Sequence, residues 1–357
     1  MLREIRRKVE NGERITDKEA LFLFNSEDIH TLGELADAVS KRINENKAYF
    51  IRNIHINLTN LCINRCRFCA FSCSKDDPGA YEMSLKEVIE KIRVAQRDMG
   101  ELREVHIVSG LHPYWSFDYY LEIIKTIKKE FPQLGIKAFT AVEVDYFAKI
   151  SGLSVKDVLS KLKESGVDIM PGGGAEIFSK RVRDKICPEK ISGERWLEII
   201  RTAHKLGIKT NATMLYGHVE SYEDRIEHLI KLRELQDETG GFLSFIPLSY
   251  QPENTEIKTP FPSGVDDIKT IAISRLVLDN IPHIKAYWIM LGEKLAQIAL
   301  LFGADCLEGT VIEEKIAHSA GARSKKGRSL EELINSIRET GKIPVERDTF
   351  YNWVRIW

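Results

Sequence analysis

The sequence predicts an α/β protein with a (β/α)8 TIM-type barrel, an N-terminal helical extension and a C-terminal helical tail. Strand-like apolar runs alternate with amphipathic helical patterns at regular intervals, which favours parallel strands joined by crossover helices. Eight such runs can be counted, and eight parallel strands close a barrel. We therefore expect a helical extension at residues 1–50, a barrel at 51–309 and a helical tail packed on the barrel at 310–357.

Each expected element has its own signal. The strands are expected at residues 53–59, 104–110, 136–143, 167–173, 208–217, 242–249, 284–291 and 304–309. Several helical patterns between them begin after a serine, a common N-cap, and several end at a glycine, a common C-cap. The serines are Ser84, Ser154 and Ser192, and the glycines are Gly100, Gly166 and Gly207.

Composition narrows the class of protein. The 357 residues include 52 Lys and Arg against 53 Asp and Glu, so no basic excess indicates a nucleic-acid partner. No apolar stretch approaches the ~20 residues that a membrane-spanning helix needs. The N-terminus is charged and lacks the apolar core of a secretion signal. We expect a cytoplasmic protein in a reducing compartment that binds neither nucleic acid nor membrane.

Cysteines are concentrated just after the first expected strand, in "CINRCRFCAFSC". Cys62, Cys66 and Cys69 are separated by three and two residues, which lets one loop ligate three irons of a four-iron cluster and leave the fourth iron open. Two alternatives stay open: Cys73 could complete a closed electron-transfer cluster, and zinc could bind here, although a second pair of ligands is missing. A disulfide framework is disfavoured, because four of the six cysteines fall within twelve residues.

Polar, glycine-rich segments follow several expected strands, at the barrel end where active sites form. They read "SGLHP" (109–113), "VEVDY" (142–146), "PGGGAE" (171–176), "YGHVE" (216–220) and "SYQPEN" (249–254). The glycines of 171–176 favour close backbone approach to an organic ligand, with a plain tight turn as the alternative. His112 and His218 each follow a strand, so they either face a ligand or are hydrogen-bonded structural groups.

The segment "CINRCRFC" resembles the signature of the radical S-adenosylmethionine superfamily. The resemblance implies a [4Fe-4S] cluster on Cys62, Cys66 and Cys69, whose open iron binds S-adenosylmethionine and cleaves it to a 5′-deoxyadenosyl radical. It also implies a small-molecule substrate and an electron donor such as flavodoxin or ferredoxin. S-adenosylmethionine is expected to contact Phe68 at the adenine, and Ile246 and Pro247 are expected to pair with the adenine through main-chain contacts. Ser109 and Gly110 are expected to meet the methionine amine through backbone carbonyls, and Glu143 and Glu176 to meet the ribose hydroxyls or the ammonium.

Longer segments narrow the resemblance to the aminofutalosine synthase family of the futalosine route to menaquinone. They include "IKAFTAVEVDYFAKISGLS", "PGGGAEIFSKRVRDKICPEK", "LQDETGGFLSFIPL" and "GTVIEEKIAHSAGA". Two sister families, dehypoxanthine futalosine cyclase and the second subunit of the deazaflavin-precursor (FO) synthase, share the cluster loop and the "YGH" and "AGA" segments. The cyclase typically has tryptophan after "FIP", where this chain has Leu248, and it lacks the "KIC" and "KIAH" wording.

The same resemblance implies that S-adenosylmethionine is a co-substrate. The adenosyl radical would add to the vinyl carbon of 3-[(1-carboxyvinyl)oxy]benzoate, the aryl ring would migrate from oxygen to carbon, and a carboxylate would leave as carbon dioxide or its radical anion. Two buried substrate carboxylates need charged or donor partners. The candidates are His112, His218 and Tyr216 as catalytic groups, the same two histidines with Asn211 and Arg183 in substrate binding, and Arg323 from the tail.

Overall fold

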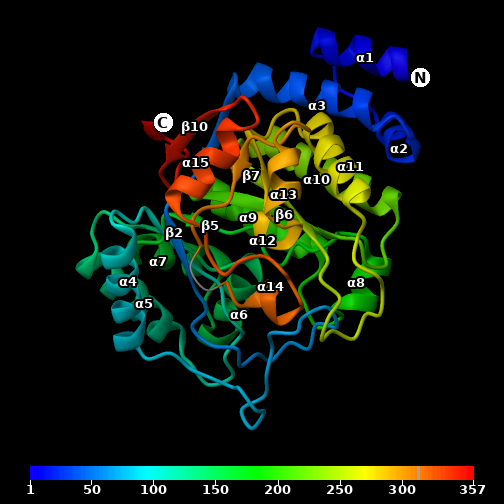
Figure 1. The fold of residues 1–357 in the computed structure, drawn as a ribbon. Helices are drawn as coiled ribbons and strands as arrows, with labels where there is room; N and C mark the ends of the chain where they lie inside the picture. The colour runs from blue at the N-terminus through cyan, green and yellow to red at the C-terminus, as the bar shows by residue number, and fades with distance from the viewer. Residues whose placement is uncertain (312–313) are drawn as a thin grey trace.

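A mostly parallel barrel forms the centre of the molecule (Figure 1). The computed structural model describes residues 1–311 and 314–357. Strands that follow one another in the chain are parallel neighbours in the sheet. They are β2 (Asn53–Ile56), β3 (Glu104–Ile107), β4 (Gly135–Ala138), β5 (Ile169–Met170), β6 (Lys209–Tyr216), β7 (Phe242–Ser249), β8 (His283–Ala286) and β9 (Cys306–Leu307).

The barrel closes through one interrupted strand. β1 (Lys47–Phe50) pairs with β9 at one end of the ladder, and β2 lies at the other end. Only Ile51 and Arg52 separate β1 from β2, so the chain itself joins the two ends. Thr310 N, just after β9, donates to Ile51 O at 3.1 Å. The predicted α/β barrel class is confirmed.

All eight expected runs contain a strand, but two of them also contain the start of a helix. The run at 136–143 leaves the sheet after Ala138 and enters α6 (Ala141–Ser151), because Thr140 and Glu143 form a capping box there. The run at 284–291 divides into β8 and α12 (Trp288–Leu291). Both helix starts are apolar and buried, so hydrophobicity alone did not distinguish them from strand.

Helices cover the outside of the barrel. In chain order they are α4 (Leu85–Met99), α5 (Phe117–Glu130), α6, α7 (Val155–Ser165), α8 (Lys180–Ile186), α9 (Gly193–Lys205), α10 (Tyr222–Thr239), α11 (Gly264–Val277), α12 and α13 (Glu293–Ala299). The three predicted serine N-caps each accept a bond from the helix backbone. In α9, Trp196, Ile199, Ile200 and Ala203 are buried at helical spacing, so one apolar face packs inward.

Both ends of the chain differ in part from the expectation. Helices α1 (Leu2–Asn11), α2 (Asp17–Asn25) and α3 (Ile29–Asn44) form the predicted extension, but β1 follows them before residue 51. The tail contains α14 (Ile316–Ser319) and α15 (Leu330–Arg338), then β10 (Ile343–Arg347) parallel to β1 and β11 (Trp353–Ile356) antiparallel to β10. The purely helical tail is therefore corrected, because the β-branched and aromatic residues near the C-terminus add two strands to the sheet.

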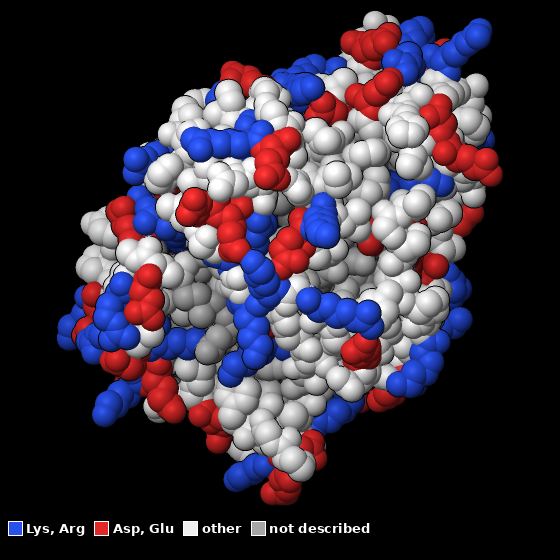
Figure 2. All heavy atoms as spheres, viewed as in Figure 1, with Lys and Arg blue, Asp and Glu red and all other residues white. Residues whose placement is uncertain are grey.

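Charged side chains of both signs are interspersed on the face of the molecule shown in Figure 2. This mixture agrees with the formal net charge of −1 at pH 7. Among the described residues, none of the helices combines the length and apolar character needed to cross a membrane.

Candidate active site

A cavity of about 290 Å³ lies inside the barrel. Alternate residues of the strands face it, as the two-residue period of a strand requires, including Asn211, Thr213 and Leu215 of β6. Cys62, Cys66 and Cys69 and the glycine-rich segment 171–174 line the same cavity. The cluster loop and the glycine turn, which are far apart in the sequence, therefore meet at one site.

The loop that carries the cysteines is braced by backbone hydrogen bonds on two sides. Ile63 N donates to Leu111 O at 3.0 Å, and Arg67 N donates to Ile186 O at 2.9 Å. The first bond joins the loop to the segment after β3, and the second joins it to the end of α8. The positions of the cysteines therefore depend on both neighbouring segments.

The three thiols suit a four-iron cluster. Among the described residues, no group of three or more His, Cys, Asp or Glu side chains could hold a single metal ion. A cluster sets a different requirement, because each thiolate binds a separate iron. Burial raises the pKa of the Cys62 thiol and raises that of Cys66 to about 12, so these thiolates need a cationic partner. Iron supplies that partner.

Cys73 does not line the cavity. Its Sγ accepts a hydrogen bond from Asn60 Nδ2 at 3.3 Å, and its backbone N donates to Asn60 O at 2.8 Å. Its backbone O accepts from Cys62 N at 3.3 Å. These contacts make Cys73 an anchor where the loop leaves the site, which supports a ligand set of three cysteines.

Glu143 connects two of the segments expected to bind S-adenosylmethionine. Its Oε1 accepts from Ser109 N at 3.2 Å, and its Oε2 accepts from Thr140 N at 2.7 Å. Burial raises the pKa of Glu143 to about 7, although the hydrogen bonds from Thr140 and Ser109 favour the carboxylate. Ser109, Gly110 and Glu143 all line the cavity, and their roles in cofactor binding stay predictions.

Lys190 is a cavity residue that the sequence analysis missed. Its Nζ lies 2.5 Å from Glu176 Oε1 and 5.0 Å from the centre of the Phe68 ring, and all three residues line the cavity. Burial disfavours the charged form of Lys190, but the nearby Cys66, Glu176 and Cys187 outweigh the effect of burial and raise the pKa of Lys190. The ammonium therefore favours thiolates in the cysteine loop. In the sequence, Lys190 belongs to "KICPEK", where a loop lysine resembles an ordinary surface charge.

The glycine turn at 171–174 is tight because it packs on β6. A Cβ at Gly172 would lie 2.6 Å from the carbonyl carbon of Ala212, and Gly174 has a φ of +87°. Gly173 O accepts from Trp196 Nε1 at 3.2 Å. The segment is therefore a tight turn whose backbone borders the cavity, and its close approach to an organic ligand stays a prediction.

His112 lies outside the cavity lining. Its Nδ1 accepts from Tyr114 N at 3.1 Å and from Trp115 N at 3.0 Å, and its Nε2 contacts the Glu82 carboxylate. The imidazole also stacks on Trp115, with ring centres 4.2 Å apart. Both ring nitrogens are therefore engaged within the loop, and the structure does not bring His112 to the predicted substrate contact.

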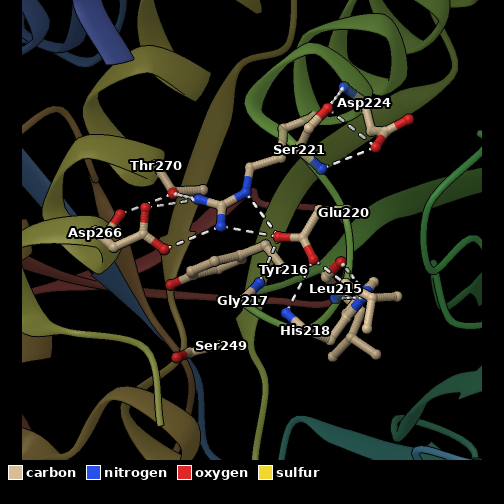
Figure 3. A network of polar contacts seen from close by, with 12 residues as sticks. Leu215, Tyr216, Gly217, His218, Glu220, Ser221, Asp224, Ser249, Asp266 and Thr270 are labelled. Carbon is tan, nitrogen blue, oxygen red and sulfur yellow. Dashed lines mark hydrogen bonds and ion pairs between the residues drawn. The ribbon is translucent and has the colours of Figure 1, made fainter. Parts of the chain in front are cut away.

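His218 and Tyr216 belong to a polar network beside the barrel (Figure 3). His218 Nε2 donates to Leu215 O at 3.0 Å, and its Nδ1 accepts from Val219 N at 2.7 Å. The Tyr216 hydroxyl donates to Asp267 Oδ1 at 2.6 Å and is fully buried. Neither residue lines the cavity, so the structure does not support the predicted catalytic contact for either.

A buried arginine organises this network. Arg225 Nε donates to Glu220 Oε1 at 2.8 Å, and its two terminal nitrogens donate to Asp266 at 2.8 and 3.0 Å. Glu220 in turn accepts from the backbone N of Gly217 and of His218, at 2.5 and 2.9 Å. The segment "YGHVE" therefore fixes the loop after β6.

Three other predicted residues also point elsewhere. The Arg183 guanidinium donates to the backbone O of Ala175 at 2.6 Å and of Ile177 at 3.1 Å. Pro247 alternates with the inward-facing Ile246, so its side chain does not line the cavity, and the expected main-chain contact of this segment with adenine stays a prediction. Arg323 is exposed and pairs with Glu253 at 2.9 Å. Asn211 and Ile246 do line the cavity, so the structure places these two where they were expected.

The fold and the cysteine loop define a radical S-adenosylmethionine enzyme. The radical SAM superfamily model matches residues 56–232, and the CofH/MqnC C-terminal region matches residues 239–357. The chain belongs to the radical SAM superfamily, whose members use a [4Fe-4S] cluster and S-adenosylmethionine.

Similar proteins cover 86–99% of this chain. An aminodeoxyfutalosine synthase from Thermus thermophilus is 46% identical over 99% of this chain and 96% of its own length. One from Streptomyces coelicolor is 42% identical over 99% and 94%. A 5-amino-6-(D-ribitylamino)uracil–L-tyrosine 4-hydroxyphenyl transferase from Methanopyrus kandleri is 46% identical over 86% and 85%.

Solved structures confirm the fold. Methylornithine synthase matches with a TM-score of 0.77 and 18% identity, over 95% of this chain and 97% of its own. The FeFe-hydrogenase maturase HydG from Carboxydothermus hydrogenoformans matches with a TM-score of 0.75 and 18% identity, over 98% and 80%.

Proposed function

We propose that this enzyme has aminodeoxyfutalosine synthase activity, with 3-[(1-carboxyvinyl)oxy]benzoate as substrate. The supporting observation is the end-to-end similarity to two synthases, at 46% and 42% identity, each over 99% of this chain. The hydroxyphenyl transferase from Methanopyrus kandleri is as similar in identity but spans 86% of the chain. A transferase of the same name from Methanococcoides burtonii is 42% identical over 99% of this chain, so the synthase is favoured by its higher identity over the full chain, 46% against 42%.

Leu248 favours the synthase over the cyclase. The cyclase family typically carries tryptophan at this position, and Leu248 lines the cavity. A leucine leaves space in the cavity that an indole would fill, so this position differs from the one typical of the cyclase.

The reaction requires the chain to hold a reactive carbon beside an alkene. When bound and reduced, the cluster supplies the 5′-deoxyadenosyl radical from S-adenosylmethionine. The protein must keep the vinyl carbon within about 3–3.5 Å of that carbon, because a primary radical otherwise takes a hydrogen atom from a neighbour. Phe68, Gly173 and Ile246 come from three different segments and line the cavity, so they can fix the nucleoside from several sides.

The remaining chemistry stays within the substrate. Addition forms a carbon–carbon bond and leaves the unpaired electron beside the enolpyruvyl carboxylate. That carbon bonds to the ring at its ether position, and the aryl–oxygen bond breaks to leave an oxygen-centred radical. The bond to the carboxylate then breaks, which forms the ketone and releases the carbon dioxide radical anion with the unpaired electron. The cavity lining includes Val108, Leu248 and Met290, apolar side chains that exclude water from this sequence.

The test is anaerobic turnover of reconstituted enzyme with dithionite and S-adenosylmethionine labelled in its adenosine carbons. The substrate arms are the enolpyruvyl benzoate, dehypoxanthine futalosine, and tyrosine with 5-amino-6-(D-ribitylamino)uracil. We expect label in an aryl ketone in the first arm alone, with 5′-deoxyadenosine as a minor product. Stoichiometric 5′-deoxyadenosine with an unlabelled product in either other arm would reject the synthase assignment.

A further inference from the structure

Three polar side chains form a row across the inside of the barrel. His55 of β2, His106 of β3 and Lys137 of β4 are register partners on adjacent parallel strands. All three line the cavity. We call these residues the inner row. The row was not singled out from the sequence, where each residue stands alone within an apolar run.

The inner row contains N–H groups that donate no hydrogen bond to the described residues. His106 Nδ1 lies 3.3 Å from His55 Nε2, while His106 Nε2 is buried and lacks a hydrogen-bond partner in the described part of the chain. The Lys137 ammonium is 1% exposed and lies 2.5 Å from Glu104 Oε1. An ammonium has three N–H donors, so one carboxylate does not saturate it.

Buried charges surround the row. Lys137, Lys285 and Arg347 are buried cations, and Glu104, Glu308 and Glu314 are buried carboxylates that act on the same groups. Burial lowers the pKa of His55 to about 4 and lowers that of His106 well below its ordinary value, so both imidazoles are neutral at pH 7. The three carboxylates balance the three cations, so binding of an anion here depends on the unused donors of Lys137 and His106.

The row lies deep in the cavity relative to the expected cofactor. His106 precedes Ser109, the residue expected near the methionine amine, by three positions on the same strand path. At about 3.3 Å per residue, the row is roughly 10 Å farther into the barrel. A substrate whose vinyl group faces the cofactor would extend its opposite end toward the row.

We propose that the inner row binds the benzoate carboxylate of the substrate, with Lys137 as the ion-pair partner and His106 Nε2 as a hydrogen-bond donor. This inference rests on the proposed synthase function. The benzoate group is the end remote from the vinyl carbon, and it is retained in the product. Its binding at the row would hold the ring in place while the enolpyruvyl carboxylate departs.

The test combines two enzyme variants with two substrates. The first variant is Lys137→Met with Glu104→Gln, which removes both charges of the pair together. The second is His106→Gln, which removes no charge. His204→Gln is the matched control, because His204 is a partly buried histidine bonded to Thr239 and Thr210 outside the cavity.

The probes are the enolpyruvyl benzoate and its analogue with a carboxamide in place of the benzoate carboxylate. Calorimetry would measure their dissociation constants in holoenzyme with S-adenosylmethionine and no reductant. We expect the wild type and the control to prefer the carboxylate by about tenfold or more, and both row variants to lose that preference. Equal weakening of both probes, or an unchanged preference, would overturn the assignment.

Turnover separates this inference from the proposed function. If the wild-type enzyme makes the labelled ketone but the row variants keep the carboxylate preference, the synthase function is supported and the binding role of the inner row is rejected. Wild-type enzyme that makes no labelled ketone would reject the function. If the double variant does not fold, His106→Gln must show the loss of preference by itself, and its failure to do so would reject the proposal.

Discussion

Replacing Gly110 by alanine should move the cluster loop. The added Cβ would lie 2.3 Å from Leu61 O and 3.1 Å from Cys62 Cβ. Ordinary van der Waals contact begins at 3.4 Å, so the methyl group and the Leu61 carbonyl must separate by about 1 Å. The carbonyl belongs to the backbone and cannot rotate away alone. The displacement therefore passes to the adjacent Cys62.

Two magnitudes follow from this shift. Overpacking of this kind costs about 1–3 kcal/mol of stability. A misplacement of about 1 Å near a reacting centre can lower the rate by roughly 10²-fold. We therefore expect Gly110→Ala to fold, to bind less iron, and to form the ketone about two orders of magnitude more slowly.

The assay measures iron and sulfide per chain after anaerobic reconstitution, thermal unfolding, and the rates of ketone and 5′-deoxyadenosine formation. Gly264→Ala is the control, because the added Cβ would meet Leu295 Cδ2 at 3.7 Å, which is an ordinary van der Waals contact. Wild-type iron content and rate in Gly110→Ala would refute the reasoning, since the loop would then tolerate the shift.

Three further outcomes are expected. Cys73→Ala should keep the cluster while Cys66→Ala loses it, as measured by iron content, and the reverse pattern would overturn the ligand assignment. His218→Ala should lower stability by about 1–3 kcal/mol in urea unfolding, because the backbone groups of Leu215 and Val219 lose their partner, but should leave the ratio of ketone to 5′-deoxyadenosine unchanged. A lower ratio would indicate substrate contact after all. Burial raises the pKa of Glu143 in the folded state, so the protonated form of Glu143 stabilises the fold. Without S-adenosylmethionine, this stabilisation should be complete below the ordinary pKa of 4.5 and should be lost as pH rises through about 7. Glu143→Gln should remove this pH dependence, and parallel stability curves for the two proteins would contradict it.

The barrel could be predicted because its signals are local. Apolar runs, serine caps and glycine ends each depend on a few neighbouring residues, and the capping serines of α4, α7 and α9 lie where they were expected. The two terminal strands had a weaker signal. β11 is exposed along its whole length, so its residues show no buried face that a sequence pattern could reveal.

The site was predictable where one segment carries the chemistry. The cysteine spacing identifies the cluster loop by itself. His112 and His218 were expected at the cavity because they follow strands, but position after a strand does not fix the direction of a side chain, and both rings turn toward nearby backbone groups. The inner row could not be predicted, because His55, His106 and Lys137 come together only through the register of three strands.

The interrupted strand of β1 and β2 has a consequence for the order of assembly. Tyr49 pairs with Cys306, and Lys47 pairs with Ile343, so both neighbours of β1 are made near the end of synthesis. Contacts this distant in the chain form late and slowly. The cysteine loop, in contrast, leaves the ribosome early. The nascent chain therefore carries the cysteine loop before the strands that complete the wall beside it have been made.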